Sequence, residues 1–336
     1  MANNSNNTLD ILNLEPNKVS RDLKGKYLLI YGAPKCGKTH FCATQLPKPL
    51  LCAFEKGYAA IPNIKAVDIE KWTDFKKVLK QLELPEAKAM YDTIVIDTCD
   101  IMAQLCEKYV CQQKGVEDLT GMPYGILYRM YSDELSTALR KITMLGYGIA
   151  LIAQQETKVV KNSLGEEVEM VQPKLDKRAL STMNALVDFI LYIGSEWDKE
   201  GNQHRYFYTR ATPYLVAGSR FGEITPKIDF SYEALINAIV EAMENSVRGK
   251  EGLLVDHAEK NTSSAIEKRP FSEVMSEAGE LWAKFPKTPE WTEKKNNIVK
   301  EFFGQPIKLS TATETQQELV EGVIEELKEL LKTVPS

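Results

Sequence analysis

The sequence predicts an α/β fold, with a mostly parallel central sheet flanked by helices, followed by a small C-terminal all-α domain. Three observations support this prediction. Short apolar runs alternate with amphipathic segments from Lys26 onward, as parallel strands alternate with crossover helices. A glycine-rich stretch at residues 32–39 follows the first apolar run and precedes a helical segment. Beyond Glu241 the pattern changes to three amphipathic segments with helical periodicity.

The expected elements of the first part follow in chain order. Strands are expected at residues 27–31, 49–54, 65–69, 93–97, 147–153, 189–193 and 206–210. Helices are expected at residues 38–45, 72–82, 101–113, 124–145 and 177–188. Residues 156–176 are polar without periodicity, so we expect a loop there. A series of short turns is expected from the last strand to Ile228.

These elements predict four regions. They are an N-terminal tail or anchor (1–24), an α/β core (25–242), a linker (243–266) and a C-terminal helical domain (267–336). The three helices of the last region are expected at residues 271–285, 291–303 and 313–331. Two alternatives stay open for its large side chains, which either pack in a core or serve a partner: Trp282, Trp291, Phe302 and Phe303.

The composition is that of an ordinary soluble protein. The 336 residues are 43% hydrophobic and 26% charged, with a formal net charge of −5. This balance argues against a general basic coat for nucleic acid but leaves room for a local basic groove. The six cysteines form no C-x-x-C pair and only three histidines exist, so no zinc site is expected. We expect the cysteines to be small buried residues in a reducing compartment.

No targeting segment is expected at the N-terminus. It begins MANNSNNT, a polar stretch unlike a signal peptide. No apolar run approaches the length of about 20 residues that a membrane-spanning helix needs. The expectation is therefore a cytoplasmic protein with no membrane partner.

Residues 32–39 match G-x-x-x-x-G-K-[ST], the phosphate-binding loop. Gly32 and Gly37 permit backbone conformations that let successive N–H groups surround a phosphate. Lys38 would reach the β- and γ-phosphates, and the Thr39 hydroxyl would bind Mg²⁺. The expected ATP-binding residues are Gly32, Ala33, Pro34, Lys35, Cys36, Gly37, Lys38, Thr39 and His40.

An apolar strand ends in an acid at Asp97. A carboxylate in this place suits the water shell of Mg²⁺, as the second acidic motif of phosphate-loop proteins does. Together the two motifs predict ATP and Mg²⁺ as ligands, with Thr39 and Asp97 as the metal-binding residues.

The order of these features resembles that of the RecA-type recombinase ATPases. The shared series is the phosphate loop, a strand ending near Glu55, the strand ending at Asp97, a helix after a flexible loop, a strand ending in Gln, a polar loop and a helix. Residues 122–141 resemble the segment between the first DNA-binding loop and the core helix. Residues 147–158, YGIALIAQQETK, resemble the strand whose terminal Gln senses the γ-phosphate. The basic N-terminal helical domain of many recombinases is lacking, so the chain looks most like the core-only, Sak-type single-strand annealing ATPases of bacteriophages. The resemblance covers residues 24–230.

The resemblance implies roles for further residues. Glu55 would activate water for attack on the γ-phosphate, although an ordinary surface acid is the alternative. Gln154, rather than Gln155, would couple loss of the γ-phosphate to the following loop, and a polar strand cap is the alternative. Arg210 or Arg220 would act in trans on the nucleotide of an adjacent subunit.

Two loops, residues 112–125 and 156–176, would line the axis of a ring or filament and hold a nucleic-acid backbone. The residues expected to contact DNA are Lys114, Tyr124, Arg129, Lys158, Lys161, Lys174, Lys177 and Arg178. Four acids in the second loop oppose this interpretation, and an ordinary surface loop is the alternative: Glu156, Glu166, Glu167 and Glu169.

The resemblance therefore implies an oligomeric, DNA-stimulated ATPase, encoded by a phage, that binds single-stranded DNA and promotes annealing or strand exchange. Its C-terminal domain would recruit a partner such as a single-strand-binding protein. The main alternative is an ATPase with a protein client and no DNA role; a helicase loader or AAA+ protein and a small-molecule kinase are others. Strand order separates the kinase, which places the acidic-motif strand beside the phosphate-loop strand, from a RecA-like core, which keeps them apart.

Overall fold

The structure is a computed structural model that describes residues 19–20, 25–161, 165–246, 254–255 and 269–334. The chain divides into two compact units, Met1–Ser263 and Ser264–Ser336. Most of the expected N-terminal tail and most of the expected linker lie outside the described residues. Within these two regions, β1 (Val19–Ser20) pairs in parallel with β12 (Leu254–Val255).

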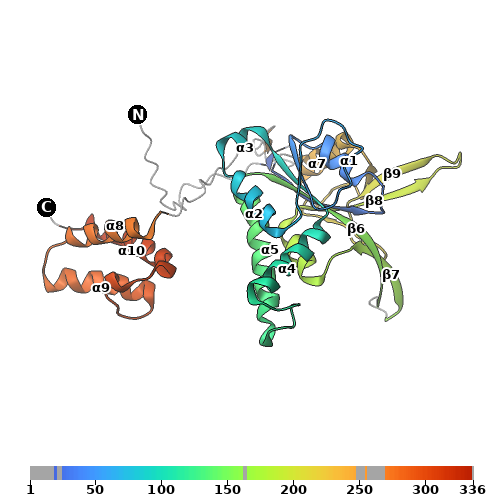
Figure 1. The fold of residues 1–336 in the computed structure, drawn as a ribbon. Helices are drawn as coiled ribbons and strands as arrows, with labels where there is room; N and C mark the ends of the chain where they lie inside the picture. Colours follow the sequence, from blue (N-terminus) through green and yellow to red (C-terminus); the bar gives the residue numbers. More distant parts are fainter. Residues whose placement is uncertain (1–18, 21–24, 162–164, 247–253, 256–268, 335–336) are drawn as a thin grey trace. The chain divides into compact units, whose positions relative to one another are not determined.

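The first unit holds a large sheet and its covering helices (Figure 1). The strands of this sheet are β2 (Tyr27–Gly32), β3 (Pro49–Ala53), β4 (Ala66–Asp68), β5 (Thr93–Asp97), β6 (Gly148–Lys161), β7 (Glu167–Pro173), β8 (Phe189–Trp197), β9 (Gln203–Tyr208), β10 (Gly218–Ser219) and β11 (Lys227–Asp229). The helices are α1 (Lys38–Thr44), α2 (Trp72–Gln81), α3 (Pro85–Met90), α4 (Cys99–Lys114), α5 (Ile126–Met144), α6 (Lys177–Leu186) and α7 (Tyr232–Ser246).

The strand order is β4-β3-β5-β6-β2-β8-β9-β11, with β10 on β8 and β7 on β6. All pairs from β4 to β8 along this path are parallel, and β9 and β11 continue the sheet in antiparallel. Because β6 lies between β5 and β2, the acidic-motif strand is kept apart from the phosphate-loop strand. The predicted α/β class with a RecA-like core is confirmed, and the order expected of a simple kinase is not found.

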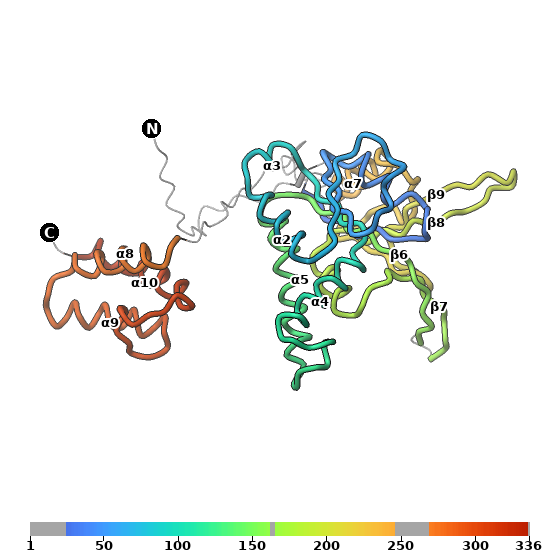
Figure 2. Tube along the Cα trace, viewed as in Figure 1, coloured from blue at the N-terminus to red at the C-terminus, as the bar shows by residue number. Residues whose placement is uncertain are grey.

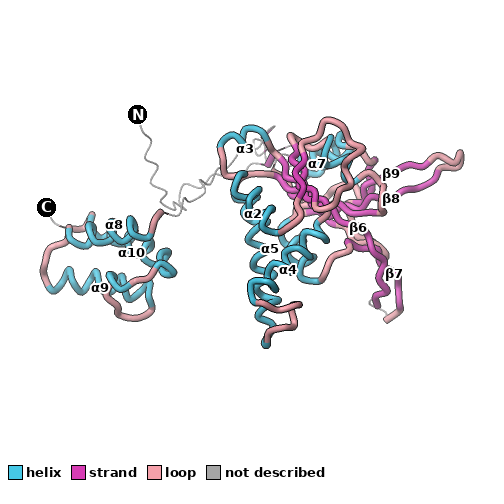
Figure 3. Tube along the Cα trace, in the orientation of Figure 1, coloured by secondary structure: helices cyan, strands magenta, loops and turns pink. Residues whose placement is uncertain are grey.

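Figure 3 shows the strands of the sheet and the helices around it. Each face of the sheet buries its own apolar layer. On β2, Leu29 and Tyr31 join a cluster with side chains of α2, α4, α5 and α6. Leu28 and Ile30 point to the opposite face and pack with side chains of α1 and α7. This alternation follows from the two-residue period of a strand, and a sheet buried on both faces explains why β2 is a continuous apolar run.

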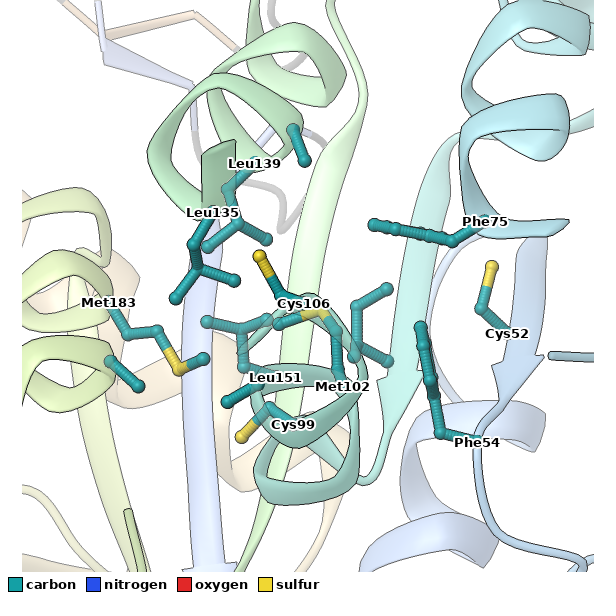
Figure 4. Close-up of a cluster of buried hydrophobic side chains, with 14 of the residues drawn as sticks. Cys52, Phe54, Phe75, Cys99, Met102, Cys106, Leu135, Leu139, Leu151 and Met183 are labelled. Atoms are coloured by element: carbon teal, nitrogen blue, oxygen red, sulfur yellow. The ribbon is translucent and has the colours of Figure 1, made fainter. Parts of the chain in front are cut away.

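The cysteines lie mainly in these apolar layers. Figure 4 shows Cys99 and Cys106 on α4 among Met102, Leu135 and Leu151. Five of the six cysteines are buried, Cys36 is half-buried, and all are free thiols. The prediction that cysteines serve as small buried residues is confirmed for these five.

The prediction of a loop at residues 156–176 is wrong. There β6 continues to Lys161 and pairs in antiparallel with β7, from Gln155 opposite Pro173 to Lys161 opposite Glu167, as a ribbon that projects from the core (Figure 2). Along β6 the adjacent Val159 and Val160 give no apolar alternation. Along β7 exposed glutamates alternate with the half-buried Val168 and Met170, a period too short to stand out in a polar segment.

Two further differences concern the later elements. The strand β8 runs four residues beyond the expected Ile193, to Trp197, and forms a second projecting hairpin with β9. The helices α3 and α7 were not expected at all. A helix as short as α3 gives almost no periodic signal. The helix α7 begins just after the expected turns and continues past Glu241, where a change of pattern was expected.

The second unit is described by itself. It contains α8 (Phe271–Ala283), α9 (Pro289–Phe303) and α10 (Gln317–Leu331), which confirms the three expected helices. Trp291 is 9% exposed and belongs to an apolar cluster, against which Trp282, Phe302 and Phe303 pack. The large aromatic side chains are therefore used for core packing. Across the described part of the chain, we find no helix with the length and apolarity needed to cross a bilayer.

Candidate functional site

The phosphate-binding loop connects β2 to α1 at the carboxyl edge of the parallel strands. Gly37 has φ 104°, in the left-handed region, and caps the N-terminus of α1. A Cβ atom on Gly32 would lie 2.8 Å from the carbonyl oxygen of Ile193, so the chain needs glycine there for close packing against β8. The first intrahelical hydrogen bond joins the Phe41 N–H to the Gly37 carbonyl at 2.9 Å, so the preceding N–H groups are free of helical partners and suited to an anion.

Lys38 extends back over this loop. Its side chain is 5% exposed, and its ammonium donates to the carbonyls of Gly32 at 3.0 Å and Ala33 at 2.8 Å. It also donates to the Oε1 of Gln154 at 3.2 Å. These partners are neutral oxygens, and the ammonium forms no direct ion pair with a described carboxylate, so a nucleotide phosphate would be its anionic partner.

Thr39 and Asp97 lie together beside the loop. The Thr39 hydroxyl donates to Asp97 Oδ2 at 2.6 Å, and Asp97 is 4% exposed. Burial raises the pKa of the Asp97 carboxyl, and the nearby carboxylates of Glu55 and Asp100 raise it further. The Thr39 hydrogen bond and the charge of Lys38 lower it, but the net shift is upward. A hydroxyl and a buried carboxylate that is disfavoured as an anion fit a divalent cation, and Mg²⁺ prefers such oxygen ligands. Thr39 and Asp97 would hold the ion directly or through its waters.

Glu55 follows β3 next to this pair. Its backbone N–H donates to the Asp97 carbonyl at 3.0 Å, so the two acids lie on adjacent strand ends. Lys56 forms its ion pair with Glu70 at 3.7 Å, and Glu55 forms none among the described residues. An exposed carboxylate without a cationic partner suits a group that orients water.

Gln154 connects the loop to the β6–β7 ribbon. It lies opposite Gly32 in the β2–β6 register, and its side chain contacts Lys38. Its backbone carbonyl accepts a hydrogen bond from the Lys174 N–H at 2.8 Å. The neighbouring Gln155 makes no contact with Lys38, and its buried Oε1 has no partner in the described part of the chain. The geometry therefore brings Gln154, and not Gln155, into contact with Lys38, and the switch role of Gln154 stays a prediction.

The start of α6 gathers cations and aromatic rings. Asp176 caps this helix by accepting from the N–H groups of Arg178 at 2.9 Å and Ala179 at 3.0 Å, and it also accepts from the Tyr131 hydroxyl of α5 at 2.7 Å. The Arg178 guanidinium lies 4.6 Å from the Tyr128 ring centroid. Lys177 and Arg178 are exposed and form no ion pair with any described residue.

Tyr124 lies just before α5, in the turn η1 (Pro123–Gly125). Its side chain is 98% exposed and its φ is 59°. A bulky residue in the left-handed region is strained, by roughly 1–3 kcal/mol. An exposed aromatic side chain at a strained turn is a frequent feature of binding sites, since neither folding nor packing needs it.

The other predicted DNA-contacting residues are spread over three elements. Lys114 ends α4, Arg129 lies exposed on α5, and Lys161 ends β6. Lys158 is paired with Glu156 at 2.7 Å, so its charge is already compensated. The structure thus brings Lys174, Lys177 and Arg178 to one end of α6 and leaves the ribbon with mixed charge.

The two arginines predicted to act in trans lie away from the chain's own phosphate loop. Arg220 pairs with Asp188 at 3.3 Å, and Asp188 precedes β8 at the opposite end of the sheet. Arg210 donates to the Phe221 carbonyl at 3.1 Å. A role in trans stays a prediction for both.

One residue at the loop was not predicted. Arg205 of β9 lies opposite Ser195 of β8 and donates from Nη1 to the Cys36 carbonyl at 2.9 Å. No sequence motif signals it, because only the register of the β8–β9 pair brings a residue 169 positions away to the phosphate loop.

This chain is similar to known proteins at the level of a family profile, a relative and a solved structure. A sequence profile of a family described as an AAA domain matches residues 24–221. The chain is 30% identical over 329 residues to the SPbeta prophage-derived protein YorG of Bacillus subtilis (strain 168), covering 96% of this chain and 99% of the relative. Among solved structures, the KaiC-like protein PH0186 of Pyrococcus horikoshii OT3 is similar at 14% identity and a TM-score of 0.35, covering 62% of this chain and 86% of that chain.

Proposed function

The chain belongs to the AAA domain family of P-loop ATPases, and on that premise we propose that it is an ATP-dependent, single-stranded-DNA-binding recombination protein that acts as an oligomer in annealing or strand exchange. The observation that carries the proposal is the double contact of Gln154. Its side chain touches the phosphate-loop lysine, and its carbonyl holds the backbone of Lys174. One residue therefore contacts both the nucleotide site and the base of the cationic surface.

The DNA surface of this proposal is the start of α6 with the adjoining end of α5. The N-terminus of α6 is already capped by the Asp176 carboxylate, so the cations Lys177 and Arg178 are what this surface offers to phosphates. Both side chains are exposed and form no ion pair with any described residue, which suits contacts to the phosphates of a nucleic acid. Tyr124 and Tyr128 offer rings for base stacking, which needs single-stranded bases.

The ATPase cycle of the proposal uses the residues around the phosphate loop. Lys38 binds the phosphate chain, Thr39 and Asp97 hold Mg²⁺, and Glu55 orients the attacking water. Mg²⁺ supplies charge neutralisation at the phosphates when bound. Release of the γ-phosphate removes an anion from Lys38 and Gln154, and the movement of Gln154 passes to Lys174 and α6. DNA binding and hydrolysis then influence each other.

Two further parts of the proposal concern assembly and origin. Arg210 or Arg220 acts on the nucleotide of a neighbouring subunit in a ring or filament, and the C-terminal helical unit recruits a single-strand-binding protein. A prophage-derived relative that matches nearly the whole chain supports the phage-encoded part of the proposal.

The decisive experiment measures ATP hydrolysis with and without oligo-dT across a salt series, together with oligo-dT binding by fluorescence anisotropy. We expect hydrolysis to rise with DNA and the effect to fade as salt rises, because phosphate contacts weaken with counterion concentration. Lys177→Ala should weaken binding and make the salt slope shallower by about 0.7. The control Lys80→Ala removes another exposed lysine, from α2. Equal effects of the two variants would contradict the proposed surface.

A second function, an ATPase with a protein client, is favoured by the charges on the β6–β7 ribbon. Glu156 neutralises Lys158 at 2.7 Å, and three further acids lie in the same ribbon: Glu166, Glu167 and Glu169. Such a ribbon repels DNA. Hydrolysis that is indifferent to DNA, with no oligo-dT retained at low salt, would favour this function.

A further inference from the structure

Arg205 lies directly over the phosphate-binding loop of its own chain. Its Nη1 donates to the Cys36 carbonyl at 2.9 Å. A Cβ atom built on Gly37 would lie 2.6 Å from the same nitrogen, so the guanidinium covers the glycine at the turn into α1. The β8–β9 hairpin that carries Arg205 starts beside the loop and projects from the core (Figure 1).

Phe230 holds the guanidinium in this place. The Arg205 guanidinium carbon lies 4.7 Å from the Phe230 ring centroid, and the Phe230 N–H donates to the Arg205 carbonyl at 3.0 Å. The ring is fixed in turn by Phe207 at 4.8 Å and by Phe41 of α1 at 5.3 Å between centroids. A planar cation stacked on a supported ring is pre-organised, so little entropy is lost when it binds a ligand.

The charge of Arg205 is not compensated within the described residues. Its side chain is exposed, and it forms no ion pair with any described acid. An arginine has five N–H donors, and the Cys36 carbonyl engages Nη1. The remaining donors are available to the phosphate oxygens of a nucleotide bound in the loop. Together with Lys38, which lies beneath the loop, Arg205 places two cations around the same anion site.

We propose that Arg205 binds the phosphate chain of the nucleotide in cis, as a second cationic contact of the site, with Phe230 as its positioning residue. Hydrogen bonds from a guanidinium to phosphate oxygens are stronger than hydrogen bonds between neutral groups. Arg205 therefore contributes to the affinity for every ligand that contains this phosphate chain. The inference rests on nucleotide binding at the loop and is independent of the DNA role.

The test compares Arg205→Ala and Arg205→Lys with Lys199→Ala, which removes an exposed cation from the turn of the same hairpin. The affinities for ATP, ADP and inorganic tripolyphosphate are measured by calorimetry on full-length protein. We expect Arg205→Ala to weaken all three by about tenfold, which corresponds to about 1.4 kcal/mol. Arg205→Lys should recover part of the loss, and Lys199→Ala should change each affinity less than twofold.

Three outcomes would overturn the proposal. Unchanged affinities with a lower melting temperature would mean that Arg205 only supports the loop through Cys36. A loss for ATP and ADP with full affinity for tripolyphosphate would mean a contact to the base or ribose. Restored hydrolysis on mixing Arg205→Ala with Lys38→Ala would mean that Arg205 acts on a neighbour's nucleotide. The affinity of the same variants for oligo-dT without nucleotide tests the DNA role separately.

Discussion

The ammonium of Lys38 lies 3.2 Å from the side-chain oxygen of Gln154, although 116 positions separate the two residues in the chain. The parallel pairing of β2 with β6, which places Gly32 opposite Gln154, produces this contact. One hydrogen bond therefore joins Lys38 of the phosphate loop to Gln154, whose carbonyl holds the backbone of Lys174 just before α6.

Lys38→Ala should lower ATP turnover by at least about a hundredfold, because it removes the buried cation that faces the phosphates. The fold should persist, since the apolar layers on both faces of the sheet are untouched. Steady-state hydrolysis and circular dichroism measure the two effects. Turnover near the wild-type rate in a folded variant would remove the assignment of the loop.

Gln154→Ala should leave ATP affinity within a few-fold of wild type but remove the effect of ATP on oligo-dT affinity, because the side-chain contact to Lys38 is lost. The matched control is Gln155→Ala, which changes the adjacent glutamine without any Lys38 contact. Anisotropy titrations with and without a slowly hydrolysed ATP analogue measure the coupling. Coupling lost equally in both variants would show that the strand end matters and the Lys38 contact does not.

Glu55→Gln should keep ATP and Mg²⁺ bound but slow hydrolysis by about 10²–10⁴-fold, the range expected when a positioned base is removed. Burst experiments with radiolabelled ATP separate the chemical step from binding. Loss of ATP binding in this variant would assign Glu55 a structural role at the end of β3.

Asp97→Asn should abolish turnover. It should also stabilise the nucleotide-free protein by about 0.5–2 kcal/mol, the usual gain when an unfavourable group is removed from a functional site. The amide oxygen still accepts from Thr39, while the buried negative charge near Glu55 and Asp100 disappears. Because the folded-state pKa of Asp97 is raised, ionisation of the carboxyl costs stability as pH rises through that pKa.

The stability difference between Asp97→Asn and wild type should therefore be largest at neutral pH and shrink as pH approaches about 4, the unfolded-state value. Thermal melts without Mg²⁺ from pH 4 to 8 measure it. A difference that grows at low pH would mean that the carboxylate is stabilised in the folded protein, contrary to its surroundings.

Tyr124→Gly should stabilise the turn before α5 by about 1 kcal/mol, because glycine adopts positive φ without strain. The same variant should weaken oligo-dT binding by about 1–3 kcal/mol through loss of a stacking ring. Tyr124→Phe keeps the ring and serves as the control. Chemical denaturation and anisotropy give the two values, and unchanged DNA affinity of the glycine variant would exclude Tyr124 from the surface.

The nucleotide site and most of the α/β order were determined by the sequence alone. The phosphate loop and the strand that ends in Asp97 depend on local patterns, since a tight glycine turn and a buried apolar run need particular residues wherever they occur. The expected strands and helices of the core were accordingly confirmed, apart from the β6–β7 ribbon, the short α3, α7, the extension of β8, the shifted bounds of β9, and β10 and β11, where only turns were expected.

Only the tertiary structure decided which distant residues meet at that site. Strand pairing brings Gln154 to Lys38 and Arg205 to Cys36, and register is set by contacts across the whole sheet that no local pattern contains. The β6–β7 ribbon escaped prediction for a related reason, since a largely exposed two-stranded ribbon leaves only a short apolar period in its sequence, here Val168 and Met170. Chemistry encoded in a single segment was visible in the sequence, and chemistry assembled between segments was visible only in the fold.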